Sequence, residues 1–221
     1  MIIATIVCPS PLGVNTDGHL ISPGGKPFPG SGNVSIACPI EMEMGHGVPP
    51  IQQVLDHGIR PSLSADVEME IPSEFFTRMR AVFTLQRILL LARQRAGETD
   101  LSTRLTVREV VEFATIEGAK DNRLDQRIGT LTPGKEADVI MLRMDQIDVM
   151  PVNNVYGAIA LGMDTSNVDA VFIGGKLRKS KGKLVGVDLN RVSRLVHQSR
   201  DHIVSKAGWP RTPLGGYLPG H

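Results

Sequence analysis

The chain has 221 residues, of which 41% are hydrophobic, 21% charged and 4% aromatic, and its formal net charge is +1. A nearly neutral chain with so few aromatic side chains offers neither the basic surface nor the stacking platform of a nucleic-acid-binding protein. Its two cysteines, without a CxxC motif, do not predict a disulfide framework, and a reducing cytoplasm is the expected setting.

The first 33 residues differ from the rest of the chain in composition. Prolines and glycines recur from Pro9 to Gly32, a pattern that favours turns over regular structure. The apolar run Met1–Cys8 is too short to cross a bilayer and has no basic residues before it, so we interpret it as a buried or edge strand and expect no membrane contact. Residues 1–33 are therefore expected to form an irregular leader that is not necessarily homologous to the remainder.

Residues 34–125 alternate apolar runs typical of strands with three- and four-residue apolar spacings typical of helices. In chain order, we expect a strand at 34–38, a helix at 51–57, a strand at 59–66, a long helix from 74 to about 97 and a helix from 106 to about 120. Thr106 and Glu109 have the spacing of a capping box, which marks the start of the last helix. This order of elements predicts a parallel sheet or barrel.

From Ile128 onward, glycine turns separate short β segments that are typical of hairpins. Strands are expected at 137–142, 168–173 and 183–185. A final helix is expected at 191–206, followed by a loose tail that begins at Gly208. The lysines of residues 176–183 are interpreted as a charged, soluble turn rather than an anion site.

Two segments resemble the signature of amidohydrolases. Residues 115–120 and 128–139 match "T-x-x-G-A" followed by "I-G-x-L-x-P-G-K-x-A-D", and residues 168–176 match the "V-x-x-V-x-x-x-G-K" hairpin that comes next in that family. The resemblance to the cytosine, guanine and triazine deaminase group implies the C-terminal part of a metal-dependent hydrolase (β/α)8 barrel at 34–125. It further implies part of a composite β-sandwich at 126–190, which leaves a terminal helix and tail at 191–221.

The resemblance also identifies candidate site residues. Asp66 falls where the family has the aspartate at the end of barrel strand eight, which holds the metal and receives the proton of the attacking water. Glu41 and His46 then lie at the C-terminal mouth of the barrel, where substrates bind in this fold, and are the candidate substrate contacts. The family usually reads S-x-G-x-D before the aspartate, whereas this chain has Ser64-Ala65-Asp66, a modest departure.

The implied reaction is hydrolysis of a non-peptide C–N bond, with deamination of a small aminated heterocycle as the expected form. In the family a divalent metal, zinc or iron, activates the water. No two of the six histidines are spaced as His-x-His, and His197 and His202 are five residues apart on a predicted helix, so they cannot readily share a metal. We therefore expect a truncated chain that holds no metal by itself and is inactive alone.

Two further hypotheses remain open at this point. The missing His-x-His motif suits a non-catalytic interaction module or a fragment. A cyclic amidase of the dihydroorotase or hydantoinase branch has the same barrel, and nothing in the residues present separates it from a deaminase. The expected partner is a small heterocyclic substrate, without nucleic acid or membrane, and the oligomeric state is undetermined.

Overall fold

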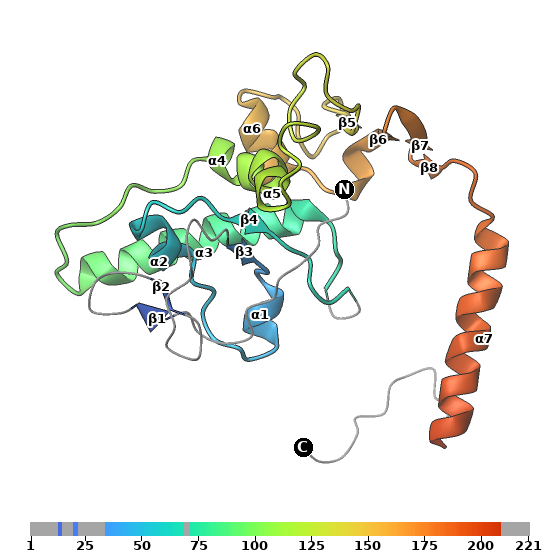
Figure 1. The fold of residues 1–221 in the computed structure, drawn as a ribbon, viewed down its shortest axis with the longest axis horizontal. Helices are drawn as coiled ribbons and strands as arrows, with labels where there is room; N and C mark the ends of the chain where they lie inside the picture. The colour runs from blue at the N-terminus through green and yellow to red at the C-terminus, as the bar shows by residue number, and fades with distance from the viewer. Residues whose placement is uncertain (1–12, 15–19, 22–33, 69–70, 209–221) are drawn as a thin grey trace. The chain divides into compact units, whose positions relative to one another are not determined.

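A computed structural model describes residues 13–14, 20–21, 34–68 and 71–208 of the chain (Figure 1). The chain divides into two compact units, residues 1–183 and 184–221. Most of the expected leader lies outside the described residues, but β1 (Gly13–Val14) and β2 (Leu20–Ile21) within it pair in antiparallel fashion. Within the part of the chain that is described, no helix has the length and apolar character needed to cross a membrane.

Two short parallel strands carry the candidate site. β3 (Ser35–Ile36) pairs with β4 (Ser62–Leu63), with Ile36 opposite Leu63, and both of these side chains are buried. Flanking backbone hydrogen bonds continue the pairing on either side, from the Ser62 N–H to the Val34 carbonyl and from the Ser64 N–H to the Ile36 carbonyl, each 2.9 Å long. The predicted parallel pair is confirmed, although each strand is shorter than its apolar run.

The connection between these strands contains α1 (Ile40–Glu43) and α2 (Ile51–Asp56). The helical spacing predicted for 51–57 is confirmed because Ile51 and Val54 are fully buried. Gly58 follows with a φ of +69°, a left-handed conformation that glycine adopts at little cost after a helix. The order of strand, helix and strand therefore matches the prediction.

α3 (Phe75–Arg95) is the long helix predicted after Pro72. It begins after Glu74, whose side chain accepts a hydrogen bond from the Thr77 N–H at 2.9 Å, and Gly97 follows its end with a φ of +87°. Its buried face presents Phe76, Met79, Val82, Phe83 and Leu90 to the hydrophobic core. This face packs against α2, β4 and α4, so α3 joins most of the core of the first unit.

The next helical stretch consists of α4 (Val107–Glu112), the π-helical segment η1 (Phe113–Glu117) and α5 (Gly118–Asp121). The predicted capping box is confirmed: the Thr106 hydroxyl accepts from the Glu109 N–H, and the Glu109 carboxylate accepts from the Thr106 N–H. Arg60, two residues before β4, reaches this stretch. Its guanidinium forms ion pairs with three carboxylates that share one side of the stretch, those of Glu109, Glu112 and Glu117.

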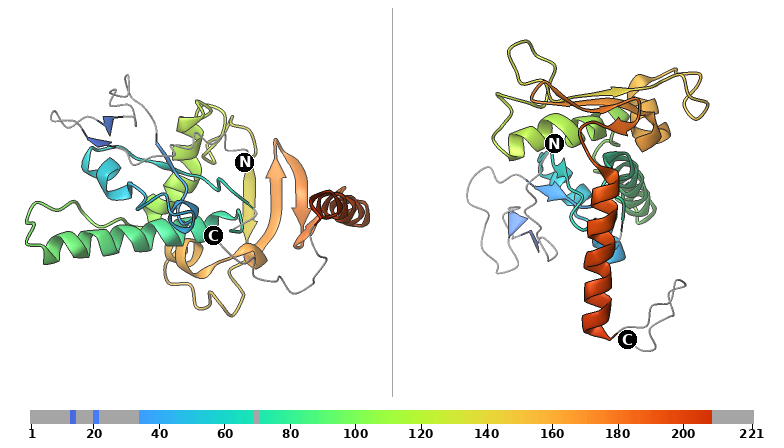
Figure 2. Two further views of the ribbon diagram at one scale, coloured as in Figure 1. Left: turned by 90° about the horizontal axis from the view of Figure 1, so that it is seen from below. Right: turned by 90° about the vertical axis from the view of Figure 1, so that its right-hand side faces the viewer.

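A four-stranded sheet follows, in the order β5-β6-β7-β8 (Figure 2). Its strands are β5 (Val139–Leu142), β6 (Val168–Ile173), β7 (Lys176–Ser180) and β8 (Lys183–Leu184). β5 and β7 both pair antiparallel to β6. Between β5 and β6 lie α6 (Val155–Gly157), η2 (Ala158–Gly162) and η3 (Thr165–Asn167). Three of the four strands were predicted; β7 occupies residues that we had interpreted as a turn.

The second unit contains α7 (Leu189–Ala207), which is capped by Asp188 at its start and followed by Gly208 with a φ of +66°. The structure confirms the predicted final helix and extends it by two residues at the start and one at the end. No side chain of α7 is buried. His197 and His202 are both exposed on it.

Candidate functional site

Asp66 lies just beyond the C-terminal end of β4. Because β3 and β4 are parallel, the residues that follow both strands meet at the same edge of the sheet. The backbone of Asp66 has a φ of +54°, in the left-handed region that is costly for a residue with a Cβ. Its N–H donates to the Ser64 hydroxyl at 3.2 Å. The carboxylate is thus carried on a short, internally bonded turn at the mouth of the strand pair.

Glu41 reaches the same region from α1, which follows β3. Its carboxylate accepts a hydrogen bond from the Ala37 N–H at 3.1 Å and is half-buried. Burial raises the pKa of Glu41, the Ala37 N–H lowers it, the negative charge of Asp66 raises it further, and His46 lowers it. The balance is a raised pKa. The charges of Asp66 and His46 thus both act on the Glu41 carboxyl.

His46 lies in the loop that follows α1, between Gly45 and Gly47, whose φ angles are +70° and +109°. The loop turns back on α1, because the His46 N–H donates to the Glu41 carbonyl at 2.9 Å. The imidazole itself is exposed. The exposed His46 imidazole, whose charge acts on the half-buried Glu41 carboxyl, is accessible to a ligand in solvent.

Arg78, on the first turn of α3, reaches the turn that carries Asp66 and was not among the candidates predicted from the sequence. Its side chain has no solvent exposure, and its Nη2 donates to the Ala65 carbonyl at 3.0 Å, one residue before Asp66. The spacing contained the signal: Arg78, Val82, Gln86 and Leu90 follow one another at four-residue steps, and all are buried. An arginine in register with a buried row is the sequence signal that could have identified Arg78 as a candidate.

Metal ions in proteins are held by groups of ligand side chains. Among residues 34–68 and 71–208, no three histidine, cysteine, aspartate or glutamate side chains are grouped so that they could hold a metal ion. His57, at the end of α2, has its Nδ1 2.7 Å from the Gln53 carbonyl, an arrangement within its own helix. In the part of the chain described, Asp66 thus belongs to no group of three metal-binding side chains.

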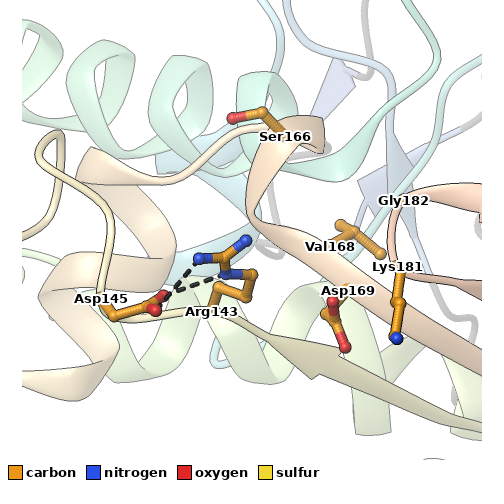
Figure 3. Close-up of a pocket in the computed structure, with 7 residues that line it drawn as sticks. All are labelled: Arg143, Asp145, Ser166, Val168, Asp169, Lys181 and Gly182. Atoms are coloured by element: carbon orange, nitrogen blue, oxygen red, sulfur yellow. Dashed lines mark hydrogen bonds and ion pairs between the residues drawn. The ribbon is translucent and has the colours of Figure 1, made fainter.

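The structure also has a surface hollow of about 490 Å³ in the four-stranded sheet region (Figure 3). It lies among residues that follow β5, begin β6 and connect β7 to β8, and none of the predicted site residues lines it. Arg143 and Asp145 on one side form two contacts of 3.0 Å with each other, so both charges are already paired. Asp169 and Lys181 lie on the other side. The hollow is therefore separate from Asp66, Glu41 and His46, which stay the candidate site residues predicted from the sequence.

The arrangement of these elements has counterparts in known proteins. Residues 2–178, well over half of the chain, match the sequence pattern that defines the amidohydrolase family. The chain belongs to the amidohydrolase family. Deaminases are among the proteins to which it is similar, in agreement with the resemblance found from the sequence.

Among curated amidohydrolases, the chain is 27% identical over 156 residues to a 5-methylthioadenosine/S-adenosylhomocysteine deaminase from Moorella thermoacetica, covering 70% of this chain and 35% of the relative. A protein of the same name from Caldanaerobacter subterraneus is 26% identical over 164 residues, covering 74% and 36%. The chain thus spans about a third of the length of the curated relatives it matches.

Solved structures of amidohydrolases share its fold. A zinc-bound adenosine deaminase from Xanthomonas campestris superimposes with a TM-score of 0.64 at 20% identity, over 75% of this chain and 36% of that one. An atrazine chlorohydrolase from Arthrobacter aurescens, complexed with zinc, has a TM-score of 0.58 at 20% identity, over 75% and 35%. These likenesses establish the mixed α/β fold of this part of an amidohydrolase.

Proposed function

We propose that the protein is a metal-dependent hydrolase that removes an amino group from a small aminated heterocycle, with Asp66 as the proton acceptor and Glu41 and His46 as substrate contacts. The observation that carries this proposal is the convergence of the three residues beyond the ends of β3 and β4, where the charges of Asp66 and His46 both act on the pKa of Glu41. The names of the deaminases to which the chain is similar support the choice of reaction.

The same proposal extends to the architecture. β3 and β4 would be the last two strands of a (β/α)8 barrel, and the sheet β5-β6-β7-β8 would belong to a composite β-sandwich. In that fold the catalytic residues lie at the C-terminal ends of the barrel strands. The position of Asp66 just after β4 is consistent with this arrangement.

In hydrolytic deamination, a water oxygen bonds to the ring carbon that bears the amino group, and the carbon–nitrogen bond then breaks to release ammonia. The reaction needs an acceptor for the proton of the water and a donor for the departing amine. The Asp66 carboxylate, carried on its turn at the strand ends, suits the acceptor. The half-buried Glu41 carboxyl, whose pKa is raised mainly by burial, suits a contact to a polar edge of the substrate heterocycle.

The family implies a divalent metal, and two of the related structures contain zinc. Catalytic zinc sites generally have three protein ligands, whereas the described residues offer no such group. These residues therefore do not fit a complete metal centre, and no step of the proposed reaction is assigned to a metal.

The decisive experiment measures ammonia release by the protein purified from its natural source, with adenosine, 5-methylthioadenosine, S-adenosylhomocysteine and guanine as substrates. Asp66→Asn is expected to lower kcat by at least about 100-fold, the usual contribution of a positioned general base. Glu41→Gln is expected to raise KM. Asp100→Asn, which removes an exposed loop carboxylate, is the matched control and should leave both constants unchanged. Equal activity of Asp66→Asn and the unaltered protein would overturn the proposal.

A non-catalytic interaction module is the rival function, and the lack of a three-residue metal group among the described residues favours it. It predicts a cooperative thermal unfolding transition that a chelator does not shift, together with no ammonia release from any substrate. The cyclic-amidase hypothesis predicts ring opening of a dihydropyrimidine without release of ammonia, so such a compound belongs in the same screen. The deaminase names of the relatives favour deamination over this alternative.

A further inference from the structure

We propose that Arg78 is a positioning residue that clamps the peptide bond between Ala65 and Asp66 and thereby orients the Asp66 carboxylate. This inference rests on the proposed function only for its catalytic consequence. The hydrogen bonds that form the clamp do not depend on that function.

The clamp consists of two hydrogen bonds to the same peptide unit. Its carbonyl oxygen, which belongs to Ala65, accepts from the Arg78 Nη2 at 3.0 Å. Its N–H, which belongs to Asp66, donates to the Ser64 hydroxyl at 3.2 Å. A peptide unit that is held at both its carbonyl and its N–H cannot rotate about the flanking bonds without breaking one of these contacts.

The conformation of Asp66 explains why such a clamp is needed. Its φ of +54° lies in the left-handed region, which disfavours every residue with a Cβ, so the turn is strained and persists only if its surroundings enforce it. The turn is formed by Ser64, Ala65 and Asp66, none of which is a glycine. The backbone itself therefore has little freedom to adopt the turn unaided, and Arg78 supplies a constraint from a different element.

The burial of Arg78 argues against a role in packing alone. The side chain is fully buried, and its Nε and Nη1 have no hydrogen-bond partner among the described residues. Burying a guanidinium with unpaired donors is costly, and an apolar side chain would fill the same space without this cost. Burial lowers the pKa of Arg78, and the negative charges of Glu74 and Asp66 are among those that oppose this effect. A cation is thus retained beside Asp66 despite its burial.

Arg80 offers a matched control. It lies two residues further along the same helix, and its guanidinium also donates to a backbone carbonyl, that of Leu161, at 3.3 Å. It makes the same type of contact but does not touch the turn that carries Asp66. A loss common to Arg78 and Arg80 variants would report helix stability, whereas a loss confined to Arg78 variants reports the clamp.

The experiment has two readouts on Arg78→Met, Arg78→Lys and Arg80→Met. The first is amide hydrogen exchange at Asp66 in the 221-residue chain, which needs no activity. We expect exchange at Asp66 to quicken by about tenfold or more in Arg78→Met, the factor that follows from losing one charge-assisted hydrogen bond. Arg78→Lys should fall between this variant and the unaltered chain, and Arg80→Met should leave Asp66 unchanged. Unchanged exchange at Asp66 in a folded Arg78→Met variant overturns the clamp, whatever the activity.

The second readout is kinetic and uses the protein from its natural source with the substrate found active. We expect Arg78→Met to lower kcat while KM stays the same, and added guanidinium ion to restore part of kcat by occupying the vacated space. Unchanged kcat in Arg78→Met, with Asp66 exchange quickened, refutes the catalytic consequence. If Asp66→Asn is itself fully active, the proposed function fails, and the exchange measurement alone still decides the clamp. If Arg78→Met does not fold, Arg78→Lys takes its place in both readouts.

Discussion

Cys38 follows β3 at the edge of the candidate site, yet its thiol is fully buried. Burial is the main cause of its raised pKa, the charge of Glu41 adds to it, and Arg78 opposes both; the result is a pKa of about 12. Since the thiolate is the reactive form, a thiol with this pKa is almost entirely protonated at neutral pH. We predict that Cys38 in the folded chain does not react with iodoacetamide at pH 8.

Peptide mapping by mass spectrometry checks this prediction and separates Cys38 from Cys8, which lies outside the described residues. Labelling of Cys38 should appear only when a denaturant unfolds the chain. Rapid modification of Cys38 in native buffer would show that the thiol is accessible and would contradict its burial in the structure.

The candidate site was partly predictable at this scale. Asp66, Glu41 and His46 were predicted from the resemblance to the amidohydrolases, and the structure shows that the segments carrying them follow β3 and β4 at the same edge of the sheet. Arg78 was missed because it was singled out only by its hydrogen bond to the Ala65 carbonyl. The sequence of a helix does not predict which backbone groups of other elements its side chains will contact. Spacing identifies a buried face, but only the fold identifies its partners.

At the scale of elements, buried amides join the helices. Gln86 on α3 has no solvent exposure; it donates to the Gln52 side chain on α2 at 3.0 Å and accepts from the Leu105 N–H at 3.2 Å. Replacing Gln86 by leucine keeps the size but leaves two buried polar groups unpaired. We predict that Gln86→Leu lowers the free energy of unfolding by about 2–6 kcal/mol, since each of the two unpaired groups costs about 1–3 kcal/mol.

Urea denaturation of the 221-residue chain measures this loss. Thr84→Ala on the same helix is the control, because Thr84 is exposed and an exposed substitution changes stability by about 0.5 kcal/mol or less. A stability of Gln86→Leu within that same margin would mean that the amide network between α2, α3 and residues 103–105 contributes nothing.

Elements with local signals were predicted best. The helix after Thr106 was found from its capping box, and α3 from its apolar periodicity, because both patterns act within one element. β7 was not found, since Lys176–Ser180 has a single apolar residue and its strand conformation comes from pairing with β6. The glycine pair Gly174-Gly175, both with positive φ, was the available signal that a hairpin would continue.

For the whole molecule, the ionisation of Asp56 makes the free energy of unfolding depend on pH. Burial opposes its charged form, but hydrogen bonds from Ser102, Gln52 and Arg93 outweigh burial and lower its pKa. A carboxyl with a lowered folded-state pKa stabilises the fold above its unfolded pKa of about 3.9, and this contribution disappears as the pH falls through the folded-state value. We predict that the stability lost in Asp56→Asn is constant from pH 7 to about pH 5 and shrinks at more acidic pH.

Urea midpoints of the unaltered chain and of Asp56→Asn, measured from pH 7 down to pH 3, check this prediction. Asp100→Asn controls for the change in net charge. A gap between the two midpoints that is as wide at pH 3 as at pH 7 would show that the charge of Asp56 does not contribute.

The edge of the four-stranded sheet has a practical consequence. Within the described residues, the sheet ends on β5, and Ile140 and Met141 on this strand are 59% and 52% exposed. The unpaired backbone groups of an apolar edge strand can pair with a strand of another molecule. Concentrated solutions of this chain are therefore expected to aggregate through β5. Purification at low protein concentration should limit this aggregation. Met141→Lys, which places a charge on the exposed edge strand, should have the same effect.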